Sequence, residues 1–134
     1  MKEFFPEIKE IKYEGPESKN VMAFKYYNKD EVIGGKPMRE HLKFAMSYWH
    51  TLKAQGLDMF GGDTMDRAWN RYDDALEQAK ARADAGFEFM QKIGMDYFCF
   101  HDRDIINEAM TLKETNRLLD EIVDHIEGLM KKTG

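Results

Sequence analysis

The middle of the chain contains a long stretch in which apolar residues recur every three or four positions. This spacing predicts a helix with one buried face, formed by Leu76, Ala79, Ala83, Phe87 and Met90. Asp73 or Asp74 can cap its amino end, and Gly94 follows the last apolar turn, where a left-handed cap is favoured. Gly86 lies inside this helix. Because glycine there costs about 1 kcal/mol relative to alanine, we expect another segment to pack closely against it.

A second helix is predicted near the carboxyl end. Thr111 and Glu114 have the spacing of a capping box, in which the hydroxyl accepts from a backbone amide and the glutamate reaches back. The apolar residues that follow again have helical spacing: Leu119, Ile122, Ile126 and Leu129. His41 and His125 lie on predicted helices, and we interpret them as structural residues.

Two other segments are apolar or aromatic at most positions and are predicted as strands, and the second has the pattern typical of a strand buried on both faces. These are Phe44–Leu52 and Met95–His101. A short apolar run can also be helical, so the first assignment depends on the polar loop that follows it. The order strand, loop, helix, strand, loop, helix gives an α/β fold with two βα units, a parallel sheet and both helices on one side. A closed barrel takes eight such units and about 250 residues, so these 134 residues predict an incomplete barrel.

The first 36 residues have a different pattern, and we interpret residues 1–36 as an extended arm that precedes a (βα)2 segment at 37–134. Pro6 and the stretch Gly15-Pro16 interrupt its apolar positions. The pair Gly34-Gly35 predicts a turn, and Pro37 can open a short helix over residues 38–42.

Composition narrows the class of protein. The chain has 43% hydrophobic and 34% charged residues, with a net charge of -5 and no long run of one sign. This balance argues against nucleic-acid and membrane partners. A single cysteine, Cys99, suits a reducing compartment, and the charged amino end is unlike a signal peptide, so we expect a cytoplasmic protein.

The candidate chemistry lies where the two predicted strands end, because the carboxyl ends of parallel strands carry the functional loops. His101 and Asp104 follow the second strand, and a carboxylate beside a histidine suits it to general acid–base catalysis. The alternative is a polar turn capped by the aspartate. Trp49 ends the first strand and can be either a wall for a sugar ring or a core aromatic. Phe60, in a polar loop, is either simply exposed or an anchor into another surface.

Only one element offers clustered metal ligands, namely His101, Asp102 and Asp104. Hard cations such as magnesium need several oxygens that converge from different elements. We therefore predict no complete metal site in this chain.

Four stretches resemble the N-terminal part of the xylose isomerases, specifically the longer-chain class with an N-terminal arm. They are SKNVMAFKYYNKDEVIGGK, HLKFAMSYWHTL, GLDMFGGDT and YFCFHDRDI, in the family's order. The resemblance implies a (β/α)8 TIM barrel that converts D-xylose to D-xylulose by ring opening and a hydride shift. It also implies two divalent metals (Mg, Mn or Co), whose ligands in the family lie on later strands.

The resemblance assigns a role to each candidate residue. His101 resembles the histidine that opens the sugar ring, and Asp104 the aspartate that orients it. Trp49 resembles a wall of the sugar pocket, and Phe60 the aromatic that reaches into a neighbouring subunit. After HDRD the family usually has alanine-proline-glutamate-glycine, whereas this chain has residues 106–109 as INEA, which frees that loop to become helical. The chain also has Val21 and Ala68 where the family usually has prolines.

Two hypotheses follow. The chain is part of a metal-dependent isomerase, acting on an aldose as a homo-oligomer or as the complement of the missing barrel portion. Alternatively, it is a truncated or engineered βα module without catalytic activity. In the second case its open sheet edge and uncovered apolar surface favour self-association.

Overall fold

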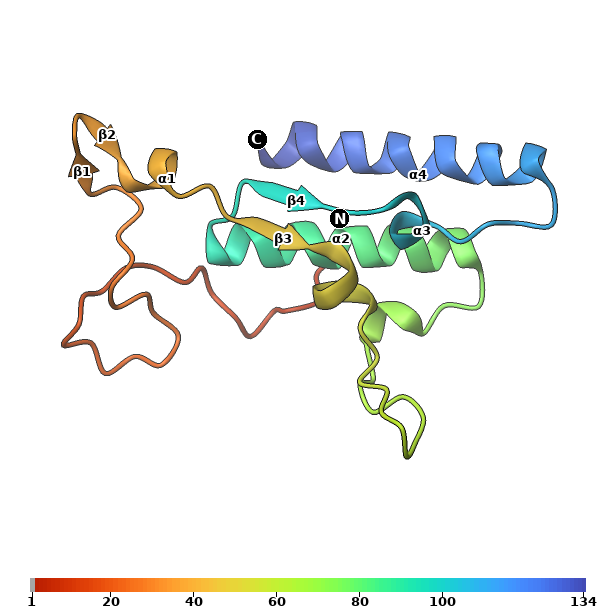
Figure 1. Ribbon diagram of the computed structural model, residues 1–134, viewed down its shortest axis with the longest axis horizontal. Coiled ribbons are helices and arrows are strands. Elements are labelled where there is room, and N and C mark those ends of the chain that lie inside the picture. The colour runs from red at the N-terminus through yellow and green to blue at the C-terminus, as the bar shows by residue number, and fades with distance from the viewer. Residues whose placement is uncertain (1) are drawn as a thin grey trace.

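The fold is built on a parallel pair of short strands that follows an irregular amino-terminal segment. The structure is a computed structural model and describes residues 2–134. Two turns that are not α-helical, Trp49–Lys53 (π) and Ala68–Asn70 (3-10), lie between the main elements. The helices and strands are β1 Val32–Ile33, β2 Lys36–Pro37, α1 Met38–His41, β3 Ala45–Ser47, α2 Ala75–Ile93, β4 Tyr97–Cys99, α3 Asp102–Ile105 and α4 Leu112–Thr133 (Figure 1).

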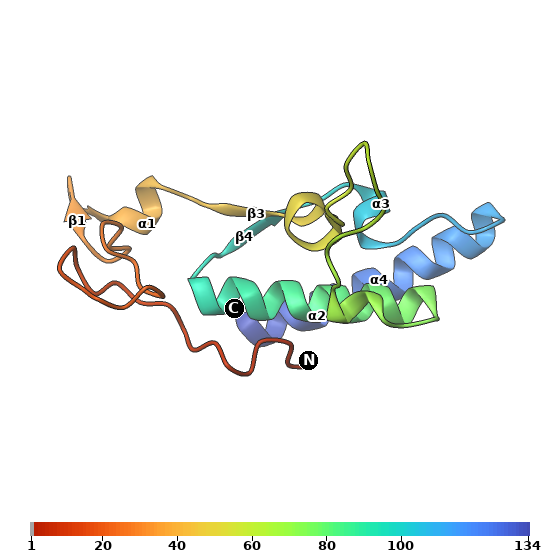
Figure 2. The ribbon, with the colours of Figure 1, turned by 90° about the horizontal axis from the view of Figure 1, so that it is seen from below.

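Strands β3 and β4 pair in parallel, with Met46 opposite Phe98, and helices α2 and α4 cover the same side of the pair (Figure 2). The prediction of an α/β fold is therefore confirmed, and along the chain α2 follows β3 and α4 follows β4. Residues 2–134 form two small sheets, of two strands each, and no closed barrel. No helix in this part of the chain is both long and apolar enough to cross a bilayer.

The predicted first strand, Phe44–Leu52, is wrong over its second half. The chain leaves β3 after Ser47 and turns helically through Trp49–Lys53. The reason lies in which side chains must be buried. A continued strand would send Tyr48, His50 and Leu52 to one face. The helical turn instead buries Tyr48 and Leu52, each 1% exposed, and leaves His50 in solvent.

The predicted helix ends are confirmed with one difference. The Asp74 carboxylate accepts from the amide of Glu77 at 2.9 Å, and Gly94 closes α2 with a φ of 70°. Thr111 caps α4 through the amide of Glu114 at 3.2 Å. The Glu114 carboxylate binds Arg117 instead of reaching back, so only half of the capping box forms.

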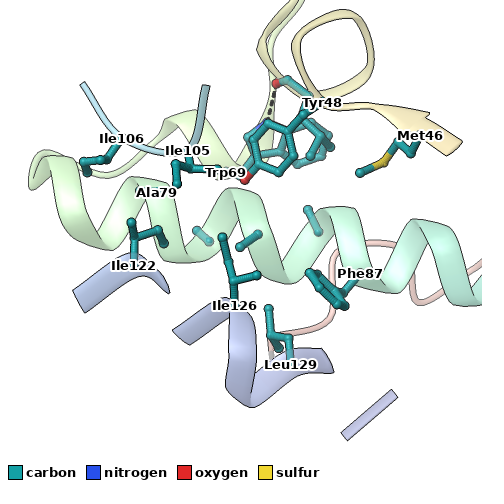
Figure 3. Packing of buried hydrophobic residues seen from close by; sticks show 14 of the residues in the cluster. Met46, Tyr48, Trp69, Ala79, Phe87, Ile105, Ile106, Ile122, Ile126 and Leu129 are labelled. Atoms are coloured by element: carbon teal, nitrogen blue, oxygen red, sulfur yellow. Dashed lines mark hydrogen bonds between the residues drawn. The ribbon is translucent and has the colours of Figure 1, made fainter. Parts of the chain in front are cut away.

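The core lies between β3, the Trp49–Lys53 turn and the two long helices (Figure 3). Gly86 of α2 lies directly beneath this turn. This agrees with the prediction that another segment packs closely against a glycine within the helix. A Cβ added to Gly86 would lie 2.8 Å from Leu52 Cδ1 and 3.3 Å from Met46 Cε. The Trp69 indole N–H donates to the Leu52 carbonyl at 2.9 Å, which fixes the other side of the turn.

Residues 2–5 lie against α2 and are held through their backbone (Figure 2). The amides of Phe4 and Phe5 donate to the Glu88 carboxylate at 2.5 and 3.1 Å, and that of Lys2 donates to Asp84 at 2.7 Å. Both phenyl rings meet Trp69 edge-on, with centroids about 6 Å apart. The amino-terminal segment thus covers part of α2.

Farther along, the Gly34-Gly35 pair makes the predicted turn and joins β1 to β2 as an antiparallel hairpin. Both glycines have positive φ, 59° and 81°. Positive φ at both central residues is what a type I′ turn requires.

Candidate functional site at the carboxyl ends of β3 and β4

His101 and Asp104 are joined by two hydrogen bonds at the start of α3. The His101 amide donates to Asp104 Oδ2 at 2.8 Å, and His101 Nδ1 lies 2.9 Å from the same oxygen. The contact is local, because α3 places its third residue beside the residue that precedes the helix. The sequence prediction that this pair can meet therefore agrees with the geometry.

This contact determines the chemistry available to the imidazole. A carboxylate facing Nδ1 holds the proton there, which leaves Nε2 as the free nitrogen. The His101 side chain is 69% exposed, whereas that of Asp104 is 11% exposed. Burial acts to raise the pKa of Asp104, but the two hydrogen bonds from His101 outweigh it and keep that pKa below its usual value. Asp104 is therefore an anion held against the largely exposed imidazole of His101.

Trp49 packs against His101, with ring centroids 4.7 Å apart and an interplanar angle of 46°. Trp49 begins the helical turn after β3, and His101 follows β4. Parallel pairing brings these two strand ends to one edge, so residues 52 positions apart in sequence become neighbours. We call Trp49, His101 and Asp104 the rim.

Two cations support α3 from behind the rim, and the sequence patterns missed both. Lys53 Nζ donates to the Arg103 carbonyl at 2.7 Å, and Arg82 Nη1 lies 3.5 Å from the Asp104 carbonyl. Burial, followed by the charge of Arg82, lowers the pKa of Lys53. One signal was present: Arg82 interrupts the apolar face of α2, one helical turn before Gly86.

The loop after α3 differs from its prediction. Residues 106–109 were expected to be free to become helical, but the helix forms before them, at Asp102–Ile105. Ile105 and Ile106 are both buried, at 3% and 4% exposure, and anchor the chain at that point. Arg103 then pairs with Glu108 across the loop. Asp104 is held in place without the proline and glycine that the family usually has there.

Phe60 lies apart from this arrangement. It is 89% exposed, in a turn closed by a hydrogen bond from its amide to Asp58 at 2.7 Å. Among residues 2–134 no group of three His, Cys, Asp or Glu side chains could hold a metal ion.

Comparison with known proteins identifies the lineage of this chain. It is 53% identical over 131 residues to the xylose isomerase of Thermotoga neapolitana, which covers 98% of this chain and 30% of that protein. The chain is homologous to the xylose isomerases. The xylose isomerases of Thermoanaerobacter pseudethanolicus and Thermoanaerobacterium saccharolyticum are 52% and 53% identical, over 96% and 98% of this chain. No family model matches.

The predicted resemblance to xylose isomerases is thus confirmed. The chain spans about 30% of the length of these relatives, which corresponds to their N-terminal portion.

Proposed function

We propose that this chain is the ring-opening portion of a xylose isomerase and that β3–α2 and β4–α4 are the first two βα units of a (β/α)8 barrel. Homology along almost the whole chain supports the lineage. The observation that carries the proposal is the rim, where the ends of both parallel strands meet and His101 presents a free nitrogen. The substrate class is an aldose, and the reaction converts D-xylose to D-xylulose.

His101 and Asp104 are the proposed catalytic pair. Opening a sugar ring breaks the bond between C1 and the ring oxygen, while a proton leaves the C1 hydroxyl and one is added to the ring oxygen. An imidazole that holds its Nδ1 proton against a carboxylate can exchange a proton at Nε2. Asp104 stabilises the charged form of the ring during that exchange.

Trp49 and Phe60 have proposed binding roles. Trp49 supplies a flat apolar surface beside His101, against which the C–H face of a sugar can lie. Phe60, which is largely exposed in its loop, is proposed to enter the sugar pocket of a neighbouring subunit.

The two divalent metals implied by the family (Mg, Mn or Co) do not fit the residues present. The described residues bring no three potential ligands together. We therefore derive no hydride-shift step from this chain and propose that the metal ligands come from polypeptide beyond residues 1–134.

Binding of sugar to the rim can be tested without metals, by histidine NMR. We expect D-xylose to shift the ring signals of His101 while leaving those of His41 and His125 in place. His101→Asn should remove the responding signal, and Arg117→Gln, near the amino end of α4 and paired with Glu114 and Glu121, should not. Equal shifts of all histidines, or none at saturating sugar, would contradict the assignment.

A second candidate is a non-catalytic module that self-associates, and one observation favours it. Large side chains around the strand pair are partly open to solvent, including Phe44 at 49%, Tyr97 at 46% and Phe100 at 44% exposure. Native mass spectrometry and a xylose–xylulose assay with added Mg, Mn or Co separate the two. Metal-dependent turnover that disappears in His101→Ala would eliminate the non-catalytic reading, whereas inactive oligomers that leave His101 unresponsive to sugar would support it.

A further inference from the structure

A polar cavity of about 710 Å³ lies behind the rim, between the loop of residues 55–67 and the first turns of α2. Its basic lining residues are Lys53, Arg67, Arg71 and Arg82, and its acidic ones are Asp63 and Asp66. Four positive and two negative groups leave this lining two charges positive, within a chain whose net charge is -5. We call it the basic cavity.

Three of its cations lack an acidic partner. Arg71 pairs with Asp66, but no carboxylate of residues 2–134 forms an ion pair with Lys53, Arg67 or Arg82. Lys53 donates to one carbonyl and so retains two N–H donors. Arg67 lies over the Trp69 ring, 5.4 Å from its centroid, and one of its nitrogens contacts only the Met65 sulfur.

Arg82 is the most unusual of the three because it is 92% buried. Its contacts are to neutral oxygens: Asn70 Oδ1 at 3.3 Å, Gln78 Oε1 at 3.1 Å and the Asp104 carbonyl. Its Nε is buried and has no hydrogen-bond partner among the described atoms, and the same holds for Arg67 Nε. A buried guanidinium that forms no ion pair is costly. Burial lowers the pKa of Arg82, and the charge of nearby Asp104 only partly opposes that shift.

We propose that the basic cavity binds a small oxyanion of the phosphate class. Such an anion would pair with cations that have no carboxylate in hydrogen-bond contact, and its several acceptor oxygens match guanidinium donors. Phosphate is preferred over a carboxylate because three unpaired cations surround the cavity. The basic cavity adjoins the rim through the contact of Arg82 with the Asp104 carbonyl, but Trp49 and His101 are not part of its lining.

The two tryptophans provide a direct test by NMR. Inorganic phosphate is titrated into the 134-residue chain at constant ionic strength, and the two indole N–H signals are followed. We expect the Trp69 signal to shift, because Arg67 lies over its ring, and the Trp49 signal beside His101 to stay in place. Chloride at the same ionic strength should move neither signal. Equal shifts of both indoles, or an equal effect of chloride, would overturn the proposal.

Charge-removing variants give the second measurement. Lys53→Gln and Arg67→Gln should each weaken phosphate binding about tenfold, since each removes one charge-assisted hydrogen bond. Arg117→Gln is the matched control, because it removes the same charge from α4, outside the cavity. Both cavity variants substitute partly exposed side chains, so we expect them to fold. Equal weakening in Arg117→Gln would show that only net charge matters and would overturn the site.

A third experiment identifies the source of the anion. Glycerol 2-phosphate is compared with inorganic phosphate under the same conditions. Tighter binding of the monoester indicates a phosphorylated metabolite, and tighter binding of inorganic phosphate indicates the free ion. Both results support an oxyanion site. Failure of both ligands to shift Trp69 would contradict it and would leave the sugar-binding test at His101 unaffected.

Discussion

Residues 2–134 contain two histidine–aspartate pairs of equal length that lie in different surroundings. His101 Nδ1 lies 2.9 Å from Asp104, and His125 Nε2 lies 2.9 Å from Asp84. The two carboxylates are also similarly buried, with side chains 11% and 10% exposed. Proximity of a histidine to an aspartate therefore does not identify a catalytic site in this protein.

The pairs differ in what else the carboxylate holds and in how much of the imidazole remains free. Asp104 binds His101 through one oxygen, and 69% of the His101 side chain is exposed. Asp84 uses both oxygens, one for His125 of α4 and one for the amide of Lys2, and His125 is only 27% exposed. The first pair presents a nitrogen to solvent, while the second joins three segments of the chain.

The largest contrast is expected when each aspartate is changed to asparagine. An amide retains one acceptor oxygen, so Asp104→Asn can still accept from His101. Asp84→Asn has no second acceptor oxygen and loses its charge, so it must turn its NH₂ group either toward the Lys2 amide or toward His125, which then has to move its proton to Nδ1. We expect Asp84→Asn to lower the free energy of unfolding by about 2 kcal/mol, and Asp104→Asn by about 1 kcal/mol or less. Urea denaturation of both variants measures this; equal losses would break the distinction between the two pairs.

The next largest loss of stability is expected at Glu88, which binds the backbone of the amino-terminal segment close to the His125–Asp84 pair. Glu88 accepts from the amides of Phe4 and Phe5 and pairs with Lys92 at 2.8 Å. Glu88→Gln should cost about 1–2 kcal/mol of unfolding free energy, because the variant loses charge-assisted hydrogen bonds. Glu77→Gln, on the same helix but exposed, is the control and should have little effect.

Lowering the pH should weaken the hydrogen bonds and the ion pair that Glu88 makes with Phe4, Phe5 and Lys92. Burial acts to raise the pKa of Glu88, but its hydrogen bonds and ion pair prevail, so the folded-state pKa is below the ordinary 4.5. The unfolded state then binds more protons, and stability is lost as the pH falls below that value and through the folded-state pKa. Unfolding free energies measured from pH 6 to pH 3 should decline less steeply in Glu88→Gln, and parallel curves would contradict this role.

An effect of similar size is expected on the rim side, at Gly86. Its added Cβ would press on Leu52 and Met46, so Gly86→Ala should destabilise the turn that carries Trp49, by about 1–2 kcal/mol net of its better helix propensity. Gly128→Ala, on α4, meets no atom within 4 Å and should stabilise the protein by up to about 1 kcal/mol. Thermal unfolding of the two variants gives the comparison, and shifts of the same sign would argue against close packing at Gly86.

The smallest stability change should come from His101 itself. Because its side chain is mostly exposed, His101→Ala should alter the unfolding free energy by only about 0.5 kcal/mol. Any sugar-induced shift at the rim should nevertheless disappear. A large loss of stability would show that His101 is a structural residue like His125.

Local patterns in the sequence predicted the helices and their ends, because caps such as Asp74 and Gly94 act within one turn. They also predicted that His101 and Asp104 meet, since that contact spans only three residues. The helical turn at Trp49–Lys53 was missed, because a short apolar run does not distinguish helix from strand until its buried partners are known.

Contacts between distant parts of the chain escaped prediction for a different reason. Arg82 supports Asp104 from 22 positions away, and Lys53 reaches Arg103 over 50 positions. Neither pair has a local signature, because each depends on how α2 and the Trp49–Lys53 turn pack around α3. Homology with xylose isomerases supplied the proposed roles of the rim residues, which spacing alone left open.

The anchoring of the amino terminus on α2 has a consequence for the order of folding. Its hydrogen bonds join residues 82 to 84 positions apart, so Phe4 and Phe5 leave the ribosome long before Glu88 exists. Contacts of such high sequence separation close late, because loop entropy must first be overcome. Phe4 and Phe5 are therefore exposed to solvent during synthesis. The charged residues around them in MKEFFPEIKEIKYE keep this segment hydrated until α2 has formed.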